Sequence, residues 1–341
     1  MARRVVPGAA LAAGIGARTL IRTTCGTTTA DGAGPAVEPG TVFDLASLTK
    51  VMATTPAVLA LADAGELALS DPVGRFVPGF RDGVRAGITV RHLLAHTGGL
   101  LASRRYYRSC STRGELLAAV IAEPLVTAPG ERVVYSDLGF LLLGQVVEAA
   151  AGAPLDAACS ALVHAPLGLT RTGYRPLAHP GLAGAPVAVT TEPGAEPAVG
   201  RPHDRNAQAC GDVAGHAGLF SVLDDVAAYA AWWAADAGGP VVPATRAEAM
   251  RCATEGRGGR RGLGWQLAGD DENFLDASWP GSTVLHTGFT GTSIAVDAVS
   301  GWWACLLTNA VHLGRDRPEV GALRTRVHRL VAAALADATA T

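Results

Sequence analysis

The chain has 341 residues, of which 49% are hydrophobic and 17% charged, so it is long enough for one large domain or two ordinary ones with a buried core. Its net charge is −2 and its arginines are scattered along the sequence. The sequence therefore shows no basic cluster of the kind that binds nucleic acids or anionic membranes. No apolar run free of Gly, Pro or charge reaches membrane-spanning length. We therefore expect a folded protein with no nucleic-acid or membrane partner.

The N-terminal segment has a basic start and an alanine-rich stretch, as a signal peptide does. Pro7, Gly8 and Gly14 interrupt any apolar helix early, so the segment is better explained as a strand, a glycine turn and a second strand at 19–22. We expect a cytoplasmic protein, with secretion as the alternative if residues 1 to about 17 act as a weak signal peptide.

A serine and a lysine lie three positions apart at Ser47 and Lys50, in front of an apolar run that predicts a helix to residue 64. Because residues i and i+3 share a helix face, the two side chains are expected to lie close together. Of the 28 lysine and arginine residues, only Lys50 is a lysine. Lysine can be brought to its neutral, basic form whereas arginine stays protonated, so this pair indicates chemistry.

The same run contains Pro56, and Gly65 is placed to end the helix. An interior proline removes a backbone hydrogen bond and costs about 3 kcal/mol, so a kink is expected at 52–56.

Short helices separated by glycine and proline turns are predicted from about residue 71 to 211. They are expected at 89–96, 113–122, 136–151 and 154–164, and the segment 176–202 is expected to be a long connecting loop. This pattern predicts a mainly helical domain, 76–211, inserted into a domain made of residues 1–75 and 212–341.

The last third of the chain returns to strands. A helix capped by Ser221 and carrying Asp224 and Asp225 in its first turn comes first. Strands are then expected at 262–267, 282–286, 292–297 and 302–308, followed by an amphipathic helix at 318–338. Strands at both ends with helices between them predict an α+β fold, in which an antiparallel sheet of about five strands is formed by both termini and flanked by helices.

Two further segments bear on the Ser47 and Lys50 pair. Tyr135, Ser136 and Asp137 stand at the start of an apolar helix, where a tyrosine hydroxyl near a lysine ammonium can act as a proton acceptor. The alternative is that Ser136 caps the helix and Tyr135 only packs.

The second segment is His286-Thr287-Gly288-Phe289, at the end of one predicted strand. Gly288 lets a substrate approach the strand, and a free N–H just beyond it can serve as an oxyanion donor. A glycine-rich hairpin with an incidental histidine is the alternative.

With these three segments in this order, the chain resembles the penicillin-recognising serine hydrolases, particularly the class C β-lactamase-like branch with its penicillin-binding proteins, esterases and D-amino-acid peptidases. The segments 41–50, 89–100 and 215–221 are similar to that branch as well, and the resemblance covers nearly the whole chain. It implies a β-lactamase/transpeptidase-like fold.

The resemblance also implies roles for single residues. Ser47 would be the acylated nucleophile, Lys50 its activating base and Tyr135 the proton relay. The backbone N–H groups of Ser47 and Phe289 would form the oxyanion hole. Substrate contacts would come from positions in the two flanking segments, namely Asp137, His286, Thr287 and Gly288.

Two departures from the family pattern shape the expected substrate. Asp137 falls where this branch usually has asparagine, and His286 falls where K-T-G members have lysine. Because a histidine is only partly charged near neutrality, we expect an ester or amide that lacks an essential carboxylate rather than efficient β-lactam hydrolysis.

The leading hypothesis is therefore a serine hydrolase that acts on an ester or amide, such as a D-amino-acid peptide or a small acyl compound, through a covalent acyl-Ser47 intermediate. The alternatives are an acyltransferase or thioesterase that passes the acyl group to an amine or hydroxyl, a β-lactamase, and a non-catalytic acyl-ligand binding protein. The expected partner is a small-molecule acyl substrate, and the chain is expected to be a monomer or a weak homodimer.

No cofactor and no metal are expected. His203, Asp204, Cys210 and His216 are possible zinc ligands by residue type, but their spacing fits no compact site. The six cysteines have no short spacings and are expected to be free thiols.

Overall fold

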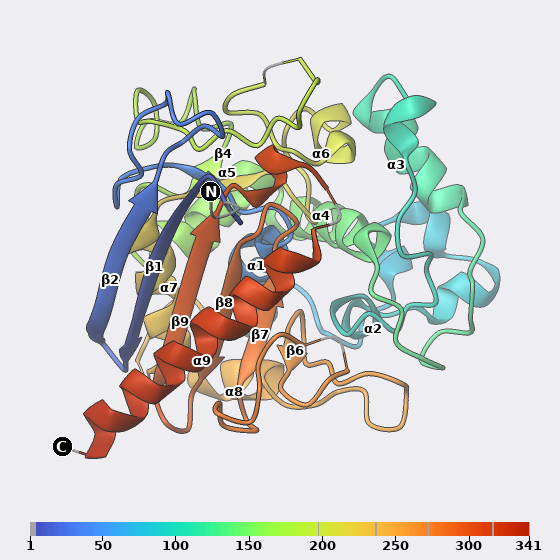
Figure 1. Ribbon diagram of the computed structural model, residues 1–341. Helices are drawn as coiled ribbons and strands as arrows, with labels where there is room; N and C mark the ends of the chain where they lie inside the picture. Colours follow the sequence, from blue (N-terminus) through green and yellow to red (C-terminus); the bar gives the residue numbers. More distant parts are fainter. Residues whose placement is uncertain (1–4, 197, 236, 272, 316, 341) are drawn as a thin grey trace.

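The protein is described by a computed structural model that covers residues 5–196, 198–235, 237–271, 273–315 and 317–340. Its main sheet is antiparallel and has six strands in the order β2-β1-β9-β8-β7-β6 (Figure 1). In that order the strands are β2 (Arg18–Gly26), β1 (Gly8–Ile15), β9 (Trp302–Thr308), β8 (Ser293–Asp297), β7 (Val284–Thr287) and β6 (Gln266–Leu267). The predicted α+β fold with a sheet built from both termini is confirmed.

The two ends of the chain meet where β1 pairs with β9, from Ala9 opposite Thr308 to Ile15 opposite Trp302. Small residues in β1 make room for large ones beside it: a Cβ added to Gly14 would lie 2.6 Å from Cζ2 of Trp303. The N-terminal segment is therefore a central strand of the sheet, as its glycine and proline pattern predicts.

Nine α-helices and two π-helical turns are present in the described ranges. They are η1 (Lys50–Thr54), α1 (Thr55–Asp63), α2 (Val90–Leu94), α3 (Arg113–Ala122), α4 (Asp137–Ala151), α5 (Leu155–Cys159), η6 (Ser160–His164), α6 (Arg205–Ala209), α7 (Leu223–Ala234), α8 (Pro243–Ala249) and α9 (Pro318–Ala340). Short 3-10 turns occur at η2 (Val73–Arg75), η3 (Pro78–Phe80), η4 (Gly83–Gly87), η5 (Tyr106–Arg108) and η7 (Ala310–Leu313).

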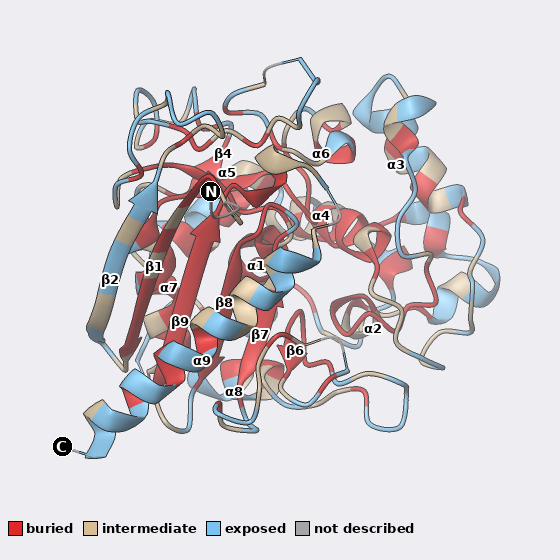
Figure 2. Cartoon of the chain, viewed as in Figure 1, coloured by how far each residue is buried: buried red, intermediate tan, exposed pale blue. Residues whose placement is uncertain are grey.

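Helices cover both faces of the main sheet. α9 crosses one face and α7 packs against β1, β8 and β9 on the other, with α1 and α4 beyond it (Figure 1). Figure 2 shows that β7, β8 and β9 are buried, while the edge strand β2 and the outer side of α9 are largely exposed. Under α9 lies a small core that includes Trp279, Trp302 and Leu335. The main core lies on the α7 face and runs without a break into α4, so it includes residues of both proposed domains.

The sequence missed a second, three-stranded sheet. It has the order β3 (Phe43–Asp44), β5 (Leu219–Ser221), β4 (Gly173–Tyr174). Strands of two or three residues are too short to show an alternating pattern. The prediction that Ser221 caps a helix was wrong: Ser221 ends β5, its hydroxyl bonds the Thr172 hydroxyl at 2.7 Å, and Val222 is the N-cap of α7.

Two other findings concern the whole described chain. No single described helix has the length and apolar composition to cross a membrane; only α4 taken together with α5–η6 passes that test, and the two parts meet at a bend of 76°. All six cysteines are free, as predicted.

Candidate active site

Ser47 lies in a tight turn between β3 and the π-helical turn η1. Ala46, just before it, has a φ of +47°, a left-handed conformation that costs a non-glycine residue energy and needs support. Asp44 provides that support, because its Oδ1 accepts a hydrogen bond from the Ala46 N–H at 2.8 Å. The turn therefore holds Ser47 in one orientation before any substrate arrives.

Lys50 is fully buried and is surrounded by three acceptors. Its Nζ donates to Ser47 Oγ at 3.0 Å and to the carbonyl of His216 at 3.1 Å, and it forms an ion pair with Asp137 Oδ1 at 2.8 Å. An ammonium has three N–H donors and a neutral amine only two, so three acceptors fit the charged form. Burial alone would lower the pKa of Lys50, but the charge of Asp137 and contacts with Tyr135 outweigh burial, and the pKa is raised.

The π-helical turn η1 follows from Pro56. This proline lies in the first turn of α1 and has no N–H to donate to the Met52 carbonyl. That carbonyl instead accepts a hydrogen bond from Nε2 of His164, at 3.2 Å, and the Val51 carbonyl accepts one from the Tyr229 hydroxyl. The sequence predicted a kink at 52–56; the structure has a π-helical turn there, and buried side chains satisfy the carbonyls that the proline leaves free.

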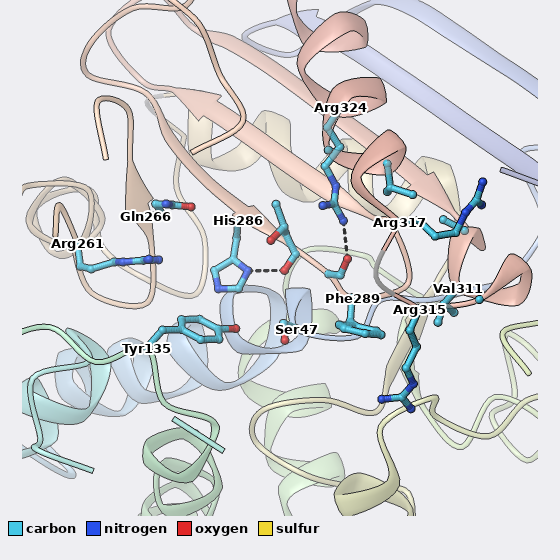
Figure 3. A pocket seen from close by; sticks show the side chains of 16 residues that line it. Ser47, Tyr135, Arg261, Gln266, His286, Phe289, Val311, Arg315, Arg317 and Arg324 are labelled. Atoms are coloured by element: carbon cyan, nitrogen blue, oxygen red, sulfur yellow. Dashed lines mark hydrogen bonds between the residues drawn. The ribbon is translucent and has the colours of Figure 1, made fainter. Parts of the chain in front are cut away.

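Tyr135 is held from both sides by His96. The His96 carbonyl accepts a hydrogen bond from the Val134 N–H at 2.9 Å, and its Nδ1 accepts one from the Ser136 N–H at 3.0 Å. The rings of His96 and Tyr135 pack against each other with their centroids 4.6 Å apart. The Tyr135 hydroxyl points toward Ser47 (Figure 3).

Ser136 and Asp137 begin α4. Ser136 is the N-cap: its Oγ accepts a hydrogen bond from the Gly139 N–H at 3.2 Å and donates one to the Leu101 carbonyl at 2.7 Å. Capping by Ser136 and orientation of Tyr135 into the site are therefore both true. Asp137, in the first turn of α4, forms an ion pair with Lys50, and this contact joins the helical part of the chain to the segment that carries Ser47.

Two backbone amides near Ser47 are free to bind an oxyanion. Among the described residues, no acceptor contacts the N–H of Ser47 or that of Phe289. The turn that carries Phe289 is anchored on the nucleophile segment, since the Thr290 hydroxyl donates to the Asp44 carbonyl at 2.7 Å. Gly288 is required for this close approach, because a Cβ there would lie 2.5 Å from the Leu45 carbonyl oxygen.

His286 is buried and neutral. Burial, with smaller contributions from the charges of Lys50 and Arg261, lowers the pKa of His286 to about 3. Its Nδ1 lies 2.9 Å from the Thr287 carbonyl, which can only accept, so Nδ1 carries the hydrogen and Nε2 is an acceptor (Figure 3). The structure thus replaces the family's lysine by a neutral group, a stronger departure than the sequence suggested.

Two cavities meet at Ser47, and both are lined by Ser47, Tyr135, Phe289 and Arg315. The sheet-side cavity, of about 370 Å³, extends between β7 and α9. It is also lined by His286, Thr287 and Gly288 of β7 and its turn, by Gln266, and by Arg261, Arg317 and Arg324. The helical-side cavity, of about 350 Å³, is bordered by residues 103–107 and 203–206 and contains Asp137.

Arginines dominate the sheet-side cavity, and no carboxylate is among the described residues that line it. Arg324 donates through Nη2 to the carbonyls of Gly288 at 2.6 Å and Thr292 at 3.2 Å (Figure 3). Burial is the cause that lowers the pKa of Arg324, to about 10. A guanidinium held there without a carboxylate beside it is an anion-binding group.

The possible metal ligands are used otherwise. Nε2 of His216 bonds Asp204 Oδ1 at 3.0 Å, and Nε2 of His203 bonds Glu192 Oε1 at 2.8 Å. In the described ranges, no three His, Cys, Asp or Glu side chains are placed to hold a metal ion.

Asp44 and the cavity arginines were missed by the sequence reasoning. Asp44 lies three residues before Ser47 in a segment already singled out, so its position was the one available signal. The arginines come from four distant parts of the chain, and only the fold brings them to Ser47.

Comparison with known proteins agrees with this fold. The family model described as Beta-lactamase matches residues 1–329. A relative from Escherichia coli (strain K12), named putative D-alanyl-D-alanine carboxypeptidase, is 32% identical over 305 residues, which are 80% of this chain and 70% of the relative.

Solved structures are similar over most of the chain. EstCE1, described as a hydrolase with promiscuous acyltransferase activity, has a TM-score of 0.73 at 25% identity and covers 94% of this chain and 93% of its own. The octameric penicillin-binding protein homologue from Pyrococcus abyssi has a TM-score of 0.74 at 22% identity, with coverage of 95% and 74%; this likeness shows the fold alone.

Proposed function

Because this chain belongs to the beta-lactamase family and is a serine hydrolase, we propose that it cleaves an ester or amide through a covalent acyl-Ser47 intermediate. The observation that carries the proposal is the contact of Ser47 Oγ with Lys50 Nζ at 3.0 Å, beside a tyrosine hydroxyl and two free backbone amides. These are a nucleophile, a proton-transfer group and an oxyanion hole in one place.

In the acylation step, Ser47 Oγ forms a bond to the substrate carbonyl carbon while the bond to the leaving group breaks. The Ser47 proton passes to the Tyr135 oxygen and from there to the leaving group. Lys50 Nζ lies 5.0 Å from the centre of the Tyr135 ring and the Arg261 guanidinium 5.7 Å from it, so two cations lie beside the residue that relays the proton. Lys50 stays charged in this scheme and holds Ser47, instead of acting first as the base that the sequence suggested.

In the second step a water molecule attacks the acyl carbon, gives its proton to Tyr135 and releases the acid as Ser47 regains its proton. The amides of Ser47 and Phe289 bind the carbonyl oxygen in both steps, where its negative charge develops.

The sheet-side cavity supports a substrate with an anionic group on one side of the scissile bond. Arg261, Arg315, Arg317 and Arg324 line it. Asp270 pairs with Arg261 at 3.7 Å and Glu192 with Arg315 at 2.5 Å, but neither carboxylate lines the cavity itself. Guanidinium groups bind carboxylates in a bidentate manner. The name of the Escherichia coli relative points the same way, because a carboxypeptidase acts next to a terminal carboxylate. This revises the sequence-based expectation of a substrate without an essential carboxylate: arginines supply the charge that His286 lacks.

Acyl transfer is the second candidate, and the likeness to EstCE1 favours it. A cavity lies on each side of Ser47, so one can hold the acyl group while an amine or hydroxyl acceptor occupies the other. Product analysis with a competing nucleophile separates this activity from hydrolysis.

Burst kinetics with p-nitrophenyl acetate test the proposal. The wild-type protein is expected to release one equivalent of p-nitrophenol rapidly, and Ser47→Ala is expected to release none. Tyr135→Phe should slow the burst about 100-fold or more, since general acid–base catalysis contributes that much. Ser278→Ala changes an exposed serine that lines neither cavity and is the matched control. A full burst from Ser47→Ala would exclude the proposed nucleophile.

A further inference from the structure

The helical-side cavity is unusual in its charge. Four arginines line it, namely Arg104, Arg105, Arg205 and Arg315, together with two carboxylates. Both carboxylates are already engaged: Asp137 forms an ion pair with Lys50 at 2.8 Å, and Asp204 binds Nε2 of His216 at 3.0 Å. They are therefore not partners for the arginines.

The four arginines differ in their own partners. Arg104 forms an ion pair with Glu123 at 2.9 Å, and Arg315 forms one with Glu192 at 2.5 Å. Arg105 and Arg205 pair with no carboxylate in the part of the chain that the structure describes. The guanidinium of Arg205 lies 5.6 Å from the ring centre of Tyr107, which also lines the cavity.

The segments that carry these arginines are fixed to each other. Asn206, which is only 9% exposed, donates through Nδ2 to the Arg104 carbonyl at 2.8 Å and accepts through Oδ1 from the Tyr107 N–H at 3.1 Å. The loop at 104–107 and the start of α6 therefore have fixed relative positions, from which the exposed side chains of Arg105 and Arg205 reach the cavity. An anion bound between them does not have to order two loops, which lowers the cost of binding.

We propose that the helical-side cavity is a second anion subsite, in which Arg105 and Arg205 bind a carboxylate on the half of the substrate that lies on this side of the scissile bond. The inference rests on the proposed acyl-Ser47 chemistry and narrows its substrate class. With the sheet-side arginines across Ser47, it describes a substrate that carries a carboxylate on each side of the bond that is cut.

The test compares two esters that differ by one charge, mono-p-nitrophenyl adipate and its methyl ester. The wild-type protein should show a kcat/KM at least about tenfold higher for the anionic ester, because one charge-assisted hydrogen bond contributes enough binding free energy for a change of that size. The double variant Arg105→Gln/Arg205→Gln should lose most of that preference. Arg108→Gln, an exposed arginine of the same segment that does not line the cavity, should keep it.

Other outcomes distinguish failure of the second anion subsite from failure of the acyl-Ser47 chemistry. Equal kcat/KM for the two esters in the wild type, or a preference that survives in the double variant and disappears in Arg324→Gln, would overturn the second subsite. Absence of acylation with either ester would instead contradict the proposed function.

Discussion

Asp44 connects the two segments that carry the proposed oxyanion hole. Its carboxylate accepts from the N–H of Ala46 at 2.8 Å and from that of His203 at 2.7 Å, and its carbonyl accepts from Thr290. The His203 ring stacks on Phe289 with centroids 5.3 Å apart. Asp44 is buried, and burial raises its pKa to about 6. Burying a charged carboxylate destabilises the folded protein, so its presence here is consistent with a role in positioning the two segments.

Asp44→Asn should therefore impair catalysis without removing any reacting group. An amide has a single acceptor oxygen, so either Ala46 or His203 loses its partner. We expect kcat to fall about 10- to 100-fold with a smaller change in KM, because small misplacements near the chemistry have effects of that size. Steady-state kinetics check this, with the exposed Asp82→Asn as control. Wild-type kcat in Asp44→Asn would contradict the positioning role.

Single residues were predictable where a motif fixed their spacing. Ser47, Lys50 and Tyr135 do lie together, and their roles stay proposals. The protonation of Lys50 and of His286 could not be predicted, because it depends on Asp137 and on burial that only the folded chain creates.

The start of α4 joins local helix capping to the active site. Ser136 satisfies the Gly139 N–H and the Leu101 carbonyl, and it stands between Tyr135 and Asp137. Stability and activity should therefore depend on the same hydroxyl.

Ser136→Ala is expected to lower the free energy of unfolding by about 1 kcal/mol and to lower kcat as well, because Tyr135 and Asp137 lose their anchor. Thr112→Ala removes a similar cap, Thr112 to the Glu115 N–H at 3.2 Å at the start of α3, and should affect stability alone. Urea unfolding and burst kinetics on both variants test this. Equal activity in the two variants would show that the cap has no special link to the site.

Most of the longer helices and strands were predicted, but α6 and α8 were missed, and the strand expected at 262–267 forms only at Gln266–Leu267. The helix 113–122 and the strand 302–308 have the bounds that the sequence indicated, because apolar periodicity and turn residues mark them clearly. β3, β4 and β5 were missed because strands of two or three residues are too short to show an alternating pattern. The cap at Ser221 was wrong because that hydroxyl bonds Thr172, a contact between segments that only the fold brings together.

Buried neutral histidines link the stability of the whole fold to pH. Burial is the main cause that lowers the pKa of His164 and His328 to about 4 and that of His286 to about 3. Below pH 6.5 the unfolded chain binds protons at these histidines that the folded chain does not, so stability falls as the pH falls from 6.5 toward 4. The pKa of Asp44 is raised to about 6, so below that pH its protonation stabilises the folded state. This effect of one group is smaller than the combined effect of the three histidines.

Urea midpoints measured between pH 7.5 and 4.5 should therefore decrease steadily on acidification. His164→Gln should make the decrease shallower, since glutamine can still donate to the Met52 carbonyl but does not titrate. A midpoint that is constant or rises below pH 6.5 would contradict this account.

The antiparallel sheet and the joining of both termini followed from the resemblance and from the strands at the two ends of the chain, whereas the strand order came from the structure alone. The positive charge around the site could not be predicted from the sequence. The net charge of the chain is −2, although seven arginines line the two cavities at Ser47. Composition reports the total charge, whereas the fold decides where the charge is concentrated.

Intact-protein mass spectrometry, followed by peptide mapping, tests the central claim most directly. The protein would be exposed to a panel of esters, D-aminoacyl amides and β-lactams and quenched in acid. We expect at least one member to add its acyl mass to the peptide that contains Ser47, with no gain in Ser47→Ala. Turnover of a panel member without an adduct on Ser47, or an adduct that persists in Ser47→Ala, would contradict the acyl-Ser47 mechanism.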